Sequence, residues 1–141
     1  MEIKDAKTYR DSIVAMLEAE KLPVSDLPAD LDNFLVALEN NEVIGVAGLE
    51  TYRNYGLLRS LAVKPTFRSQ GVAGKLLKEI ESTAVNKGIT AVYLLTETAA
   101  DYFDRKNYCR ISRADIPTDV QESSEFSYAC PQSAIVMKKT L

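Results

Sequence analysis

The sequence predicts a mixed α/β (α+β) fold in which a mostly antiparallel sheet is flanked by helices. Two apolar runs, Phe34–Glu39 and Val43–Tyr52, are separated by a short polar turn and predict a β-hairpin. A third run, Leu57–Val63, extends this hairpin into an antiparallel meander. It then leads through a glycine-containing loop into an amphipathic helix and a further strand. That order is typical of a crossover between two parallel strands.

The elements before the hairpin are shorter. Glu2–Ala6 predicts a first strand, and an N-cap signature at Thr8 precedes apolar residues at helical spacing, which predicts a helix over Tyr9–Glu20. Leu22–Asp32 contains two prolines and three aspartates, so we expect a loop with at most one helical turn. Its position makes this loop a candidate to face a substrate.

The second half of the chain begins with the clearest helix. Apolar residues recur every three or four positions over Gly71–Lys87, and Gly88 is placed to end this helix. We expect the remaining elements to be a buried strand at Ala91–Thr96, a short helix at Thr98–Lys106, strands at Arg110–Ala114 and Ala134–Lys139, and an irregular, partly helical connection from Pro117 to Pro131.

Composition limits the class of protein. The 141 residues are 46% hydrophobic and 26% charged, which predicts a single soluble domain over residues 1–141. No signal-peptide core and no apolar run of membrane-spanning length occur, so we expect a cytoplasmic protein. The chain has no histidine, which excludes Ser-His-Asp and Cys-His catalysis. Without histidine, two isolated cysteines favour reduced thiols over a zinc site, and we expect no metal.

The strand, loop and helix between Leu57 and Gly74 form a candidate anion site. The first N–H groups of a helix lack intrahelical partners and lie at the positive end of its dipole, and Gly71 and Gly74 let a ligand approach the backbone closely. Between Thr51 and Lys78 there are six basic residues and no acidic one. This pattern favours a polyphosphate ligand over a nucleic acid, although solvated surface charges would also produce it.

Two common phosphate loops do not fit. A Walker A loop needs Gly at position 69 and Ser or Thr at position 76, where this chain has Ser69 and Leu76. A dinucleotide-binding loop needs one more glycine before Gly71 and an acidic residue that ends the next strand, and this chain has neither.

A third kind of loop does match. Residues Arg68-Ser69-Gln70-Gly71-Val72-Ala73 follow a strand and match the pattern Q/R-x-x-G-x-G/A, after a strand end that reads LAV-Lys-Pro. The strand YLLT, which ends at Thr96, and the segment Tyr102–Tyr108 extend the likeness, the latter resembling F-Y-x-x-x-G-F with its tyrosine and glycine replaced. Together these segments resemble the GNAT family of acyl-CoA N-acetyltransferases.

The resemblance implies a sheet whose two central parallel strands splay apart, with acetyl-CoA as cosubstrate. Backbone groups of Leu61, Ala62 and Val63 would pair with the pantetheine arm and polarise the thioester carbonyl. Backbone amides over residues 68–74 would hold the pyrophosphate; the residues concerned are Arg68, Ser69, Gln70, Gly71, Val72, Ala73 and Gly74. Thr96 and Phe103 are further candidate cofactor contacts. The amine would attack directly, without a covalent enzyme intermediate.

The proton transfers have candidates with open alternatives. Glu50, near the end of an apolar strand, is the candidate general base, and a solvated strand-end carboxylate is the alternative. The family often uses a tyrosine as general acid, but Phe103 stands at that position. Either the neighbouring Tyr102 serves, or the thiolate leaves without a protein acid. Adjacent helical residues point about 100° apart, which favours the second possibility.

Three residues are candidates for the acceptor pocket. Arg59 interrupts an apolar strand, where a charge needs a partner; a substrate anion and a protein carboxylate such as Glu50 are both possible partners. The aromatic residues Phe34 and Tyr52 are candidate pocket walls, with core packing as the alternative.

The segments GLLRSLAV, YLLTETAADYFDR and EFSYACPQSAIVMKK are similar to the ArsN-like arsenic-resistance acetyltransferases. This resemblance implies an acceptor that is a small amino acid or its arsenic- or phosphorus-containing analogue. A polyamine or peptide N-terminus is the alternative, for which Asp26, Asp30, Asp32 and Glu50 offer an acidic cleft. A non-catalytic acyl-CoA-binding regulatory module is a third hypothesis. We expect no nucleic-acid or membrane partner, and family analogy alone suggests a homodimer.

Overall fold

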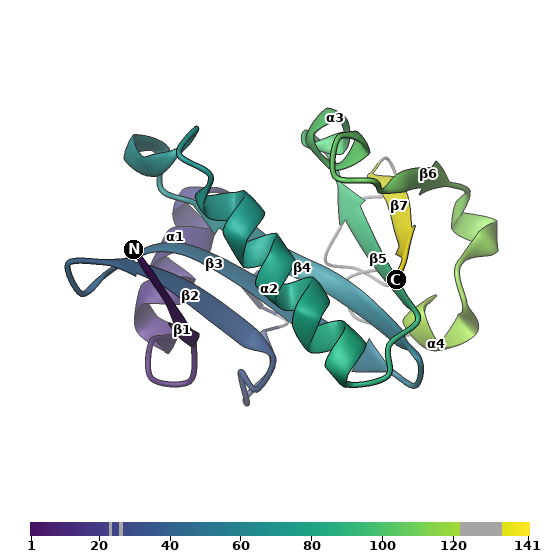
Figure 1. Cartoon of the computed structure of the whole chain (residues 1–141), viewed down its shortest axis with the longest axis horizontal. Coiled ribbons are helices and arrows are strands. Elements are labelled where there is room, and N and C mark those ends of the chain that lie inside the picture. The colour runs from purple at the N-terminus through teal and green to yellow at the C-terminus, as the bar shows by residue number, and fades with distance from the viewer. Residues whose placement is uncertain (23, 26, 122–133) are drawn as a thin grey trace.

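The computed structural model describes residues 1–22, 24–25, 27–121 and 134–141. In these residues one sheet carries the strands in the order β1-β2-β3-β4-β5-β7-β6 (Figure 1). The pair β4/β5 is parallel and the other neighbours are antiparallel. The strands are β1 (Glu2–Asp5), β2 (Phe34–Glu39), β3 (Glu42–Tyr52), β4 (Tyr55–Val63), β5 (Ala91–Thr96), β6 (Cys109–Ile111) and β7 (Ile135–Thr140).

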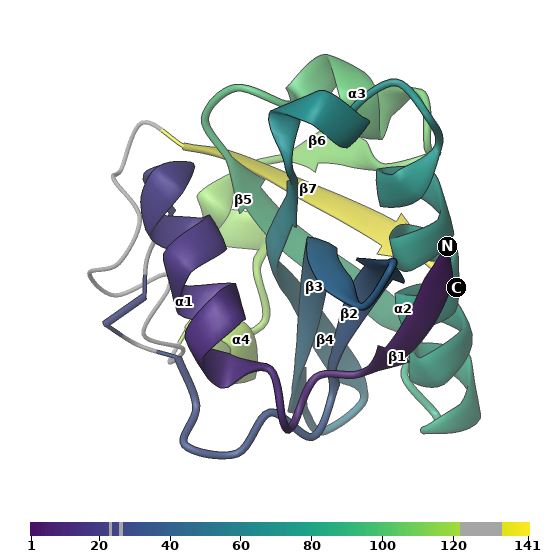
Figure 2. The ribbon, with the colours of Figure 1, turned by 90° about the vertical axis from the view of Figure 1, so that its left-hand side faces the viewer.

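Helices cover both faces of this sheet. The helices are α1 (Arg10–Ala19), α2 (Val72–Asn86), α3 (Ala100–Asp104) and α4 (Thr118–Gln121), with 3-10 turns at Pro65–Phe67 and Arg113–Asp115. Figure 2 shows α1 and α2 on opposite sides of β2, β3 and β4. None of the helices in the described ranges has the length and apolar character needed to cross a bilayer.

Small residues on β3 let the layers approach closely. A Cβ atom at Gly45 would lie 3.0 Å from the Leu76 side chain and 3.1 Å from that of Val72, so this glycine fits the strand against α2. The core under α2 also contains Leu49, Leu58 and Ile80. A second apolar cluster, which includes Ile13, Leu17 and Phe34, fills the opposite face under α1.

The centre of the sheet is irregular in a way that opens it. Val46 pairs with Ala62 but Gly48 pairs with Arg59, so β4 carries one extra residue in a bulge, where Ser60 has a φ of 59°. The parallel register of β4 and β5 ends at the pair Leu57 and Tyr93. Beyond that pair the two strands diverge (Figure 1), which confirms the predicted splay.

Most predicted elements are confirmed, with two corrections. The Thr8 cap is wrong, because α1 begins at Arg10 and its N-cap residue Tyr9 makes no capping side-chain bond. The strand predicted at Arg110–Ala114 is a shorter strand, β6, followed by a 3-10 turn that the Ser112 side chain caps. In the predicted connection from Pro117 to Pro131, α4 occupies the first part and residues 122–131 lie outside the described residues.

Candidate active site

The loop between β4 and α2 exposes backbone donors. Ser69 and Gly71 have φ values of 66° and 81°, and Gly71 is the N-cap of α2. A Cβ at Gly71 would meet nothing within 4 Å, so this glycine serves the left-handed conformation rather than close packing. The bond from the Lys75 N–H to the Gly71 carbonyl, 3.1 Å long, is an opening bond of the helix. The first turn contains no acidic residue, so an anion fits there.

The predicted concentration of positive charge around this loop is wrong. Four of the six basic residues pair with carboxylates that the fold brings from distant segments: Arg53 with Asp119, Arg59 with Glu50, Lys64 with Glu42 and Arg68 with Glu20. Arg68 also donates through Nε to the Val63 carbonyl at 3.1 Å. The loop therefore offers an anion its backbone N–H groups and the helix dipole more than the side chains of these four residues.

The candidate residues for the thioester lie beside the splay. Leu61, Ala62 and Val63 follow the bulge at Ser60 and lie past the last residue pair that joins β4 to β5. The side chains of Ala62 and Val63 are buried, with 7% and 8% exposure. Ala62 and Val63 therefore offer a ligand little side-chain surface, whereas Leu61 is partly exposed.

The aromatic residues of α3 have different surroundings. Phe103 is 5% exposed and packs edge-to-face against Tyr102 and Tyr108, so the structure places it in the core rather than on a cofactor surface. The Tyr102 hydroxyl is buried and has no hydrogen-bond partner within the described residues. Burial raises the pKa of Tyr102. The Thr96 hydroxyl accepts a bond from the Ala99 N–H at 2.9 Å and so has a structural role before α3.

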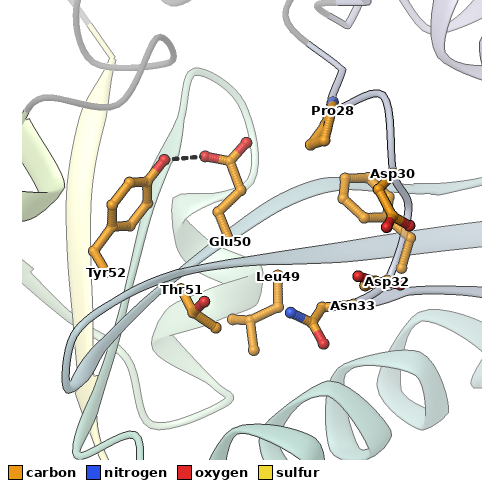
Figure 3. A pocket seen from close by; sticks show the side chains of 9 residues that line it. Pro28, Asp30, Asp32, Asn33, Leu49, Glu50, Thr51 and Tyr52 are labelled. Atoms are coloured by element: carbon orange, nitrogen blue, oxygen red, sulfur yellow. Dashed lines mark hydrogen bonds between the residues drawn. The ribbon is translucent and has the colours of Figure 1, made fainter.

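A cavity of about 450 Å³ lies on the α1 side of the sheet, and it brings together the predicted residues Phe34, Glu50 and Tyr52. Figure 3 shows the Tyr52 hydroxyl directed at the Glu50 carboxylate. The full lining is Pro28, Asp30, Asp32, Asn33, Phe34, Leu49, Glu50, Thr51 and Tyr52. Residues of the loop before β2 therefore line the same cavity as the predicted residues Phe34, Glu50 and Tyr52. Asn33, Leu49 and Thr51 had no recognisable signal in the sequence.

Arg59 forms a buried ion pair beside this cavity. Its Nη1 donates to Glu50 Oε2 at 2.7 Å, and its Nε donates to the Ser60 hydroxyl at 3.1 Å. The Tyr52 hydroxyl donates to the other Glu50 oxygen, Oε1. The Arg59 side chain is 1% exposed and that of Glu50 is 13% exposed. Of the two predicted partners for Arg59, the protein carboxylate is confirmed, but the pair is buried rather than solvated.

A row of residues across three strands explains this burial. Gly48 pairs with Phe34 on one side and with Arg59 on the other. A Cβ at Gly48 would lie 2.4 Å from the Phe34 ring, so the ring lies over the glycine. The Arg59 guanidinium carbon is 6.0 Å from the centre of that ring. Gly48 thus lets Phe34 reach the guanidinium, a consequence of strand register that residue order alone does not reveal.

The cavity rim is acidic. Asp32 pairs with Lys7 at 3.0 Å, which lowers the pKa of Asp32, and a hydrogen bond to Asp32 raises the pKa of Asp30. The third aspartate of this loop, Asp26, lies outside the described residues. Across the described ranges, no group of three or more His, Cys, Asp or Glu side chains is arranged to hold a metal ion.

Comparison with known proteins identifies the family. The model of the acetyltransferase (GNAT) family matches residues 6–108. The chain therefore belongs to the GNAT family, and it is an acetyl-CoA-dependent N-acetyltransferase of that type.

Individual relatives agree with this assignment. An uncharacterized N-acetyltransferase of Chlorobaculum tepidum is 28% identical over 126 residues, which cover 86% of this chain and 79% of that protein. An amino-acid acetyltransferase of Ralstonia nicotianae is 26% identical over 115 residues, covering 80% of this chain but 25% of that protein. The N-acetylglutamate synthase of Neisseria gonorrhoeae, solved with coenzyme A and N-acetyl-glutamate, shares the fold with a TM-score of 0.84 at 19% identity. The match covers 99% of this chain and 35% of the synthase.

Proposed function

We propose that this chain acetylates the amine of a small molecule whose amino group is recognised by Glu50. The observation that carries the proposal is a carboxylate held by two donors at the wall of a cavity of about 450 Å³. An ionised carboxylate has about four lone-pair sites, so two accepted bonds leave capacity for a ligand ammonium. The cavity volume suits a small acceptor.

Backbone groups would hold the cosubstrate. The amides over residues 68–74, with their left-handed residues and an acid-free first helical turn, fit a diphosphate. The backbone of Leu61, Ala62 and Val63 lies beside the splay and fits the pantetheine arm. Acetyl-CoA supplies an activated acyl group, and the chain's part is to place the amine next to it.

Glu50 is our candidate general base. Tyr52 and Arg59 fix both carboxylate oxygens, so the carboxylate is oriented before an acceptor arrives. In that position Glu50 would bind the ammonium and then take its proton, which leaves the neutral amine that can attack a carbonyl. Arg59, 3% exposed, acts in this scheme through Glu50 rather than by contact with the acceptor.

The leaving thiolate needs no protein acid in this scheme. The Phe103 ring lies in the core and has no proton to donate. The Tyr102 hydroxyl lies beside the first turn of α2, where a Cβ on Gly74 would be 3.9 Å away. We therefore assign Tyr102 to the phosphate end of the cosubstrate site in this scheme. A thiolate leaves without assistance because the pKa of a thiol is low.

Amino-acid-like acceptors are our first candidate, including arsenic- or phosphorus-containing amino acids. Three segments of the sequence resemble arsenic-resistance acetyltransferases. A relative at 26% identity is an amino-acid acetyltransferase, although this chain spans a quarter of that protein.

Polyamines are the second candidate, because the cavity rim is acidic. Asp30 and Asp32 line the cavity together with Glu50. A second ammonium on the acceptor would meet these rim carboxylates, whereas a carboxylate on the acceptor would be repelled by them. The rim therefore separates the two candidates by charge.

An acceptor screen tests both candidates. We would follow coenzyme A release with phosphinothricin-like and arsinothricin-like amino acids, glutamate and spermidine. Turnover of the amino acids alone supports the first candidate, and turnover of spermidine alone supports the second. The variant Glu50→Gln should lower kcat about a hundredfold or more, while Glu79→Gln, an exposed carboxylate on α2, serves as the control. Release by none of these amines, or full activity of Glu50→Gln, would refute the proposal.

A further inference from the structure

We propose that Lys106 and the Tyr102 hydroxyl, which lie beside the N-terminal turn of α2, bind the diphosphate of the cosubstrate together with that turn. This inference rests on the cosubstrate placement above and adds side-chain ligands to a site otherwise built from backbone. Both residues belong to the segment of α3 and its C-terminal end, far from the loop in sequence.

The contact geometry brings these groups to one place. A Cβ built on Gly74, in the first turn of α2, would lie 3.5 Å from Lys106 Nζ and 3.9 Å from the Tyr102 hydroxyl. The Lys106 ammonium also lies 5.5 Å from the centre of the Tyr102 ring. Both polar ends therefore lie beside the first turn of α2, next to the position that a Gly74 side chain would take.

The charge at this place is uncompensated. A lysine ammonium at the positive end of a 15-residue helix is electrostatically unfavourable unless an anion lies nearby. Within the described ranges no carboxylate pairs with Lys106, whereas four basic residues nearer to the loop in sequence are paired. A bound phosphate would neutralise the ammonium and the helix terminus together.

The Tyr102 hydroxyl is the second, independent sign of a ligand. It is buried and without a partner among the described residues, and a buried polar group left unpaired is destabilising. Burial raises its pKa, so it remains a protonated donor. A phosphate oxygen in front of Gly74 would accept from this hydroxyl and from the Lys106 ammonium.

Coenzyme A carries phosphate in two positions, and the geometry favours the diphosphate. The two side chains lie against the first turn of α2, whose N–H groups have no intrahelical partner, and a diphosphate has enough oxygens to accept from both sets of donors. The 3′-phosphate of the nucleotide is the other source of the same chemistry. Dephospho-coenzyme A, which lacks only that group, distinguishes the two.

Direct binding measurements test the proposal without an acceptor. We would titrate coenzyme A and dephospho-coenzyme A into wild type, Lys106→Met, Lys106→Arg and Tyr102→Phe by calorimetry. Lys106→Met should lower the affinity for both ligands about tenfold or more, which is the loss expected for a charge-assisted hydrogen bond. Tyr102→Phe should lower the affinity for both ligands by a smaller factor, and Lys106→Arg should retain most of the affinity. Lys4→Met, an exposed charge on β1, controls for net charge.

The outcomes separate this inference from the proposed function. Unchanged affinity in Lys106→Met, with the same melting temperature as wild type, would overturn the inference. So would a loss seen with coenzyme A but absent with dephospho-coenzyme A. S-acetyl-pantetheine, which has no diphosphate, should be used equally well by wild type and Lys106→Met. Failure of every acceptor in the screen, with coenzyme A binding intact, would refute the proposed acceptors and leave this inference standing.

Discussion

Replacing Arg59 by methionine should destabilise the protein strongly, because it leaves Glu50 as a largely buried carboxylate without its ion-pair partner. The side chains of Arg59 and Glu50 are 1% and 13% exposed, and their charged atoms are 2.7 Å apart. Removing one partner of a buried ion pair costs about 3–5 kcal/mol. Domains of this size lose about 2–4 °C of melting temperature per kcal/mol, so we expect a decrease of about 6–20 °C.

A double-mutant cycle separates the pair from the loss of arginine packing. Glu50→Gln and the double variant Arg59→Met with Glu50→Gln complete the cycle, measured by urea unfolding. Because the carboxamide carries no charge, the double variant should lose less stability than the sum of the single variants, with a coupling of at least about 1 kcal/mol. Purely additive losses would refute the conclusion that this ion pair organises the cavity wall.

Kinetic measurements on a substitution at the same position distinguish two roles for Arg59. If Arg59 acts through Glu50, a milder change such as Arg59→Lys should affect acceptors with and without a carboxylate alike. If Arg59 instead binds an anion on the acceptor, only acceptors that carry a carboxylate or arsinate should show a raised KM. The guanidinium lies against Phe34 and is almost fully buried, which favours the first outcome.

Three further changes test separate parts of the structure. Gly48→Ala would place a Cβ 2.4 Å from the Phe34 ring and should cost about 1–3 kcal/mol in urea unfolding. Burial and a hydrogen bond to Glu81 raise the pKa of Tyr108 far above its ordinary value of 10.0. The stability that protonated Tyr108 contributes is therefore complete below pH 10 and is lost as the pH rises further. Above pH 10, the Tyr108→Phe variant should lose less of its free energy of unfolding than the wild type does. Gly74→Ala should raise the melting temperature, because alanine favours the helix by up to about 1 kcal/mol. The same variant should lower the affinity for coenzyme A measured by calorimetry.

The elements with strong local periodicity could be predicted from the sequence. The hairpin of β2 and β3 and helix α2 follow from alternating and helical patterns that tertiary contacts reinforce. The cap of α1 could not be predicted, since Thr8 has a suitable side chain but the helix begins two residues later. Helix ends depend on where the chain enters the fold as well as on the residue present.

The candidate residues Arg59 and Glu50 were predictable from the sequence, and their pairing was one of two alternatives between which the sequence could not decide. Arg59 and Glu50 were both recognisable as charges in apolar strands, but their contact depends on the bulge at Ser60 and on the register of β3 with β4. Likewise, the basic residues around the phosphate loop form a run in the sequence, but acids from distant segments neutralise four of them, Arg68 and Lys64 included. Long-range charge pairing is a property of the fold, so sequence proximity overstated the potential of the loop.

The proposed site has a cosubstrate half and an acceptor half, which bind their ligands through different kinds of groups. The two halves should therefore respond differently to substitutions. In the site that we propose, the cosubstrate half depends mainly on backbone amides, which require the left-handed conformation of Gly71, and on the side chains of Lys106 and Tyr102. The acceptor half depends on the Glu50 carboxylate and its two donors, surrounded by the exposed aspartates Asp30 and Asp32. Neutralising the exposed aspartates removes charge from the rim without disturbing the buried pair, so acceptor choice can change while cosubstrate binding stays the same.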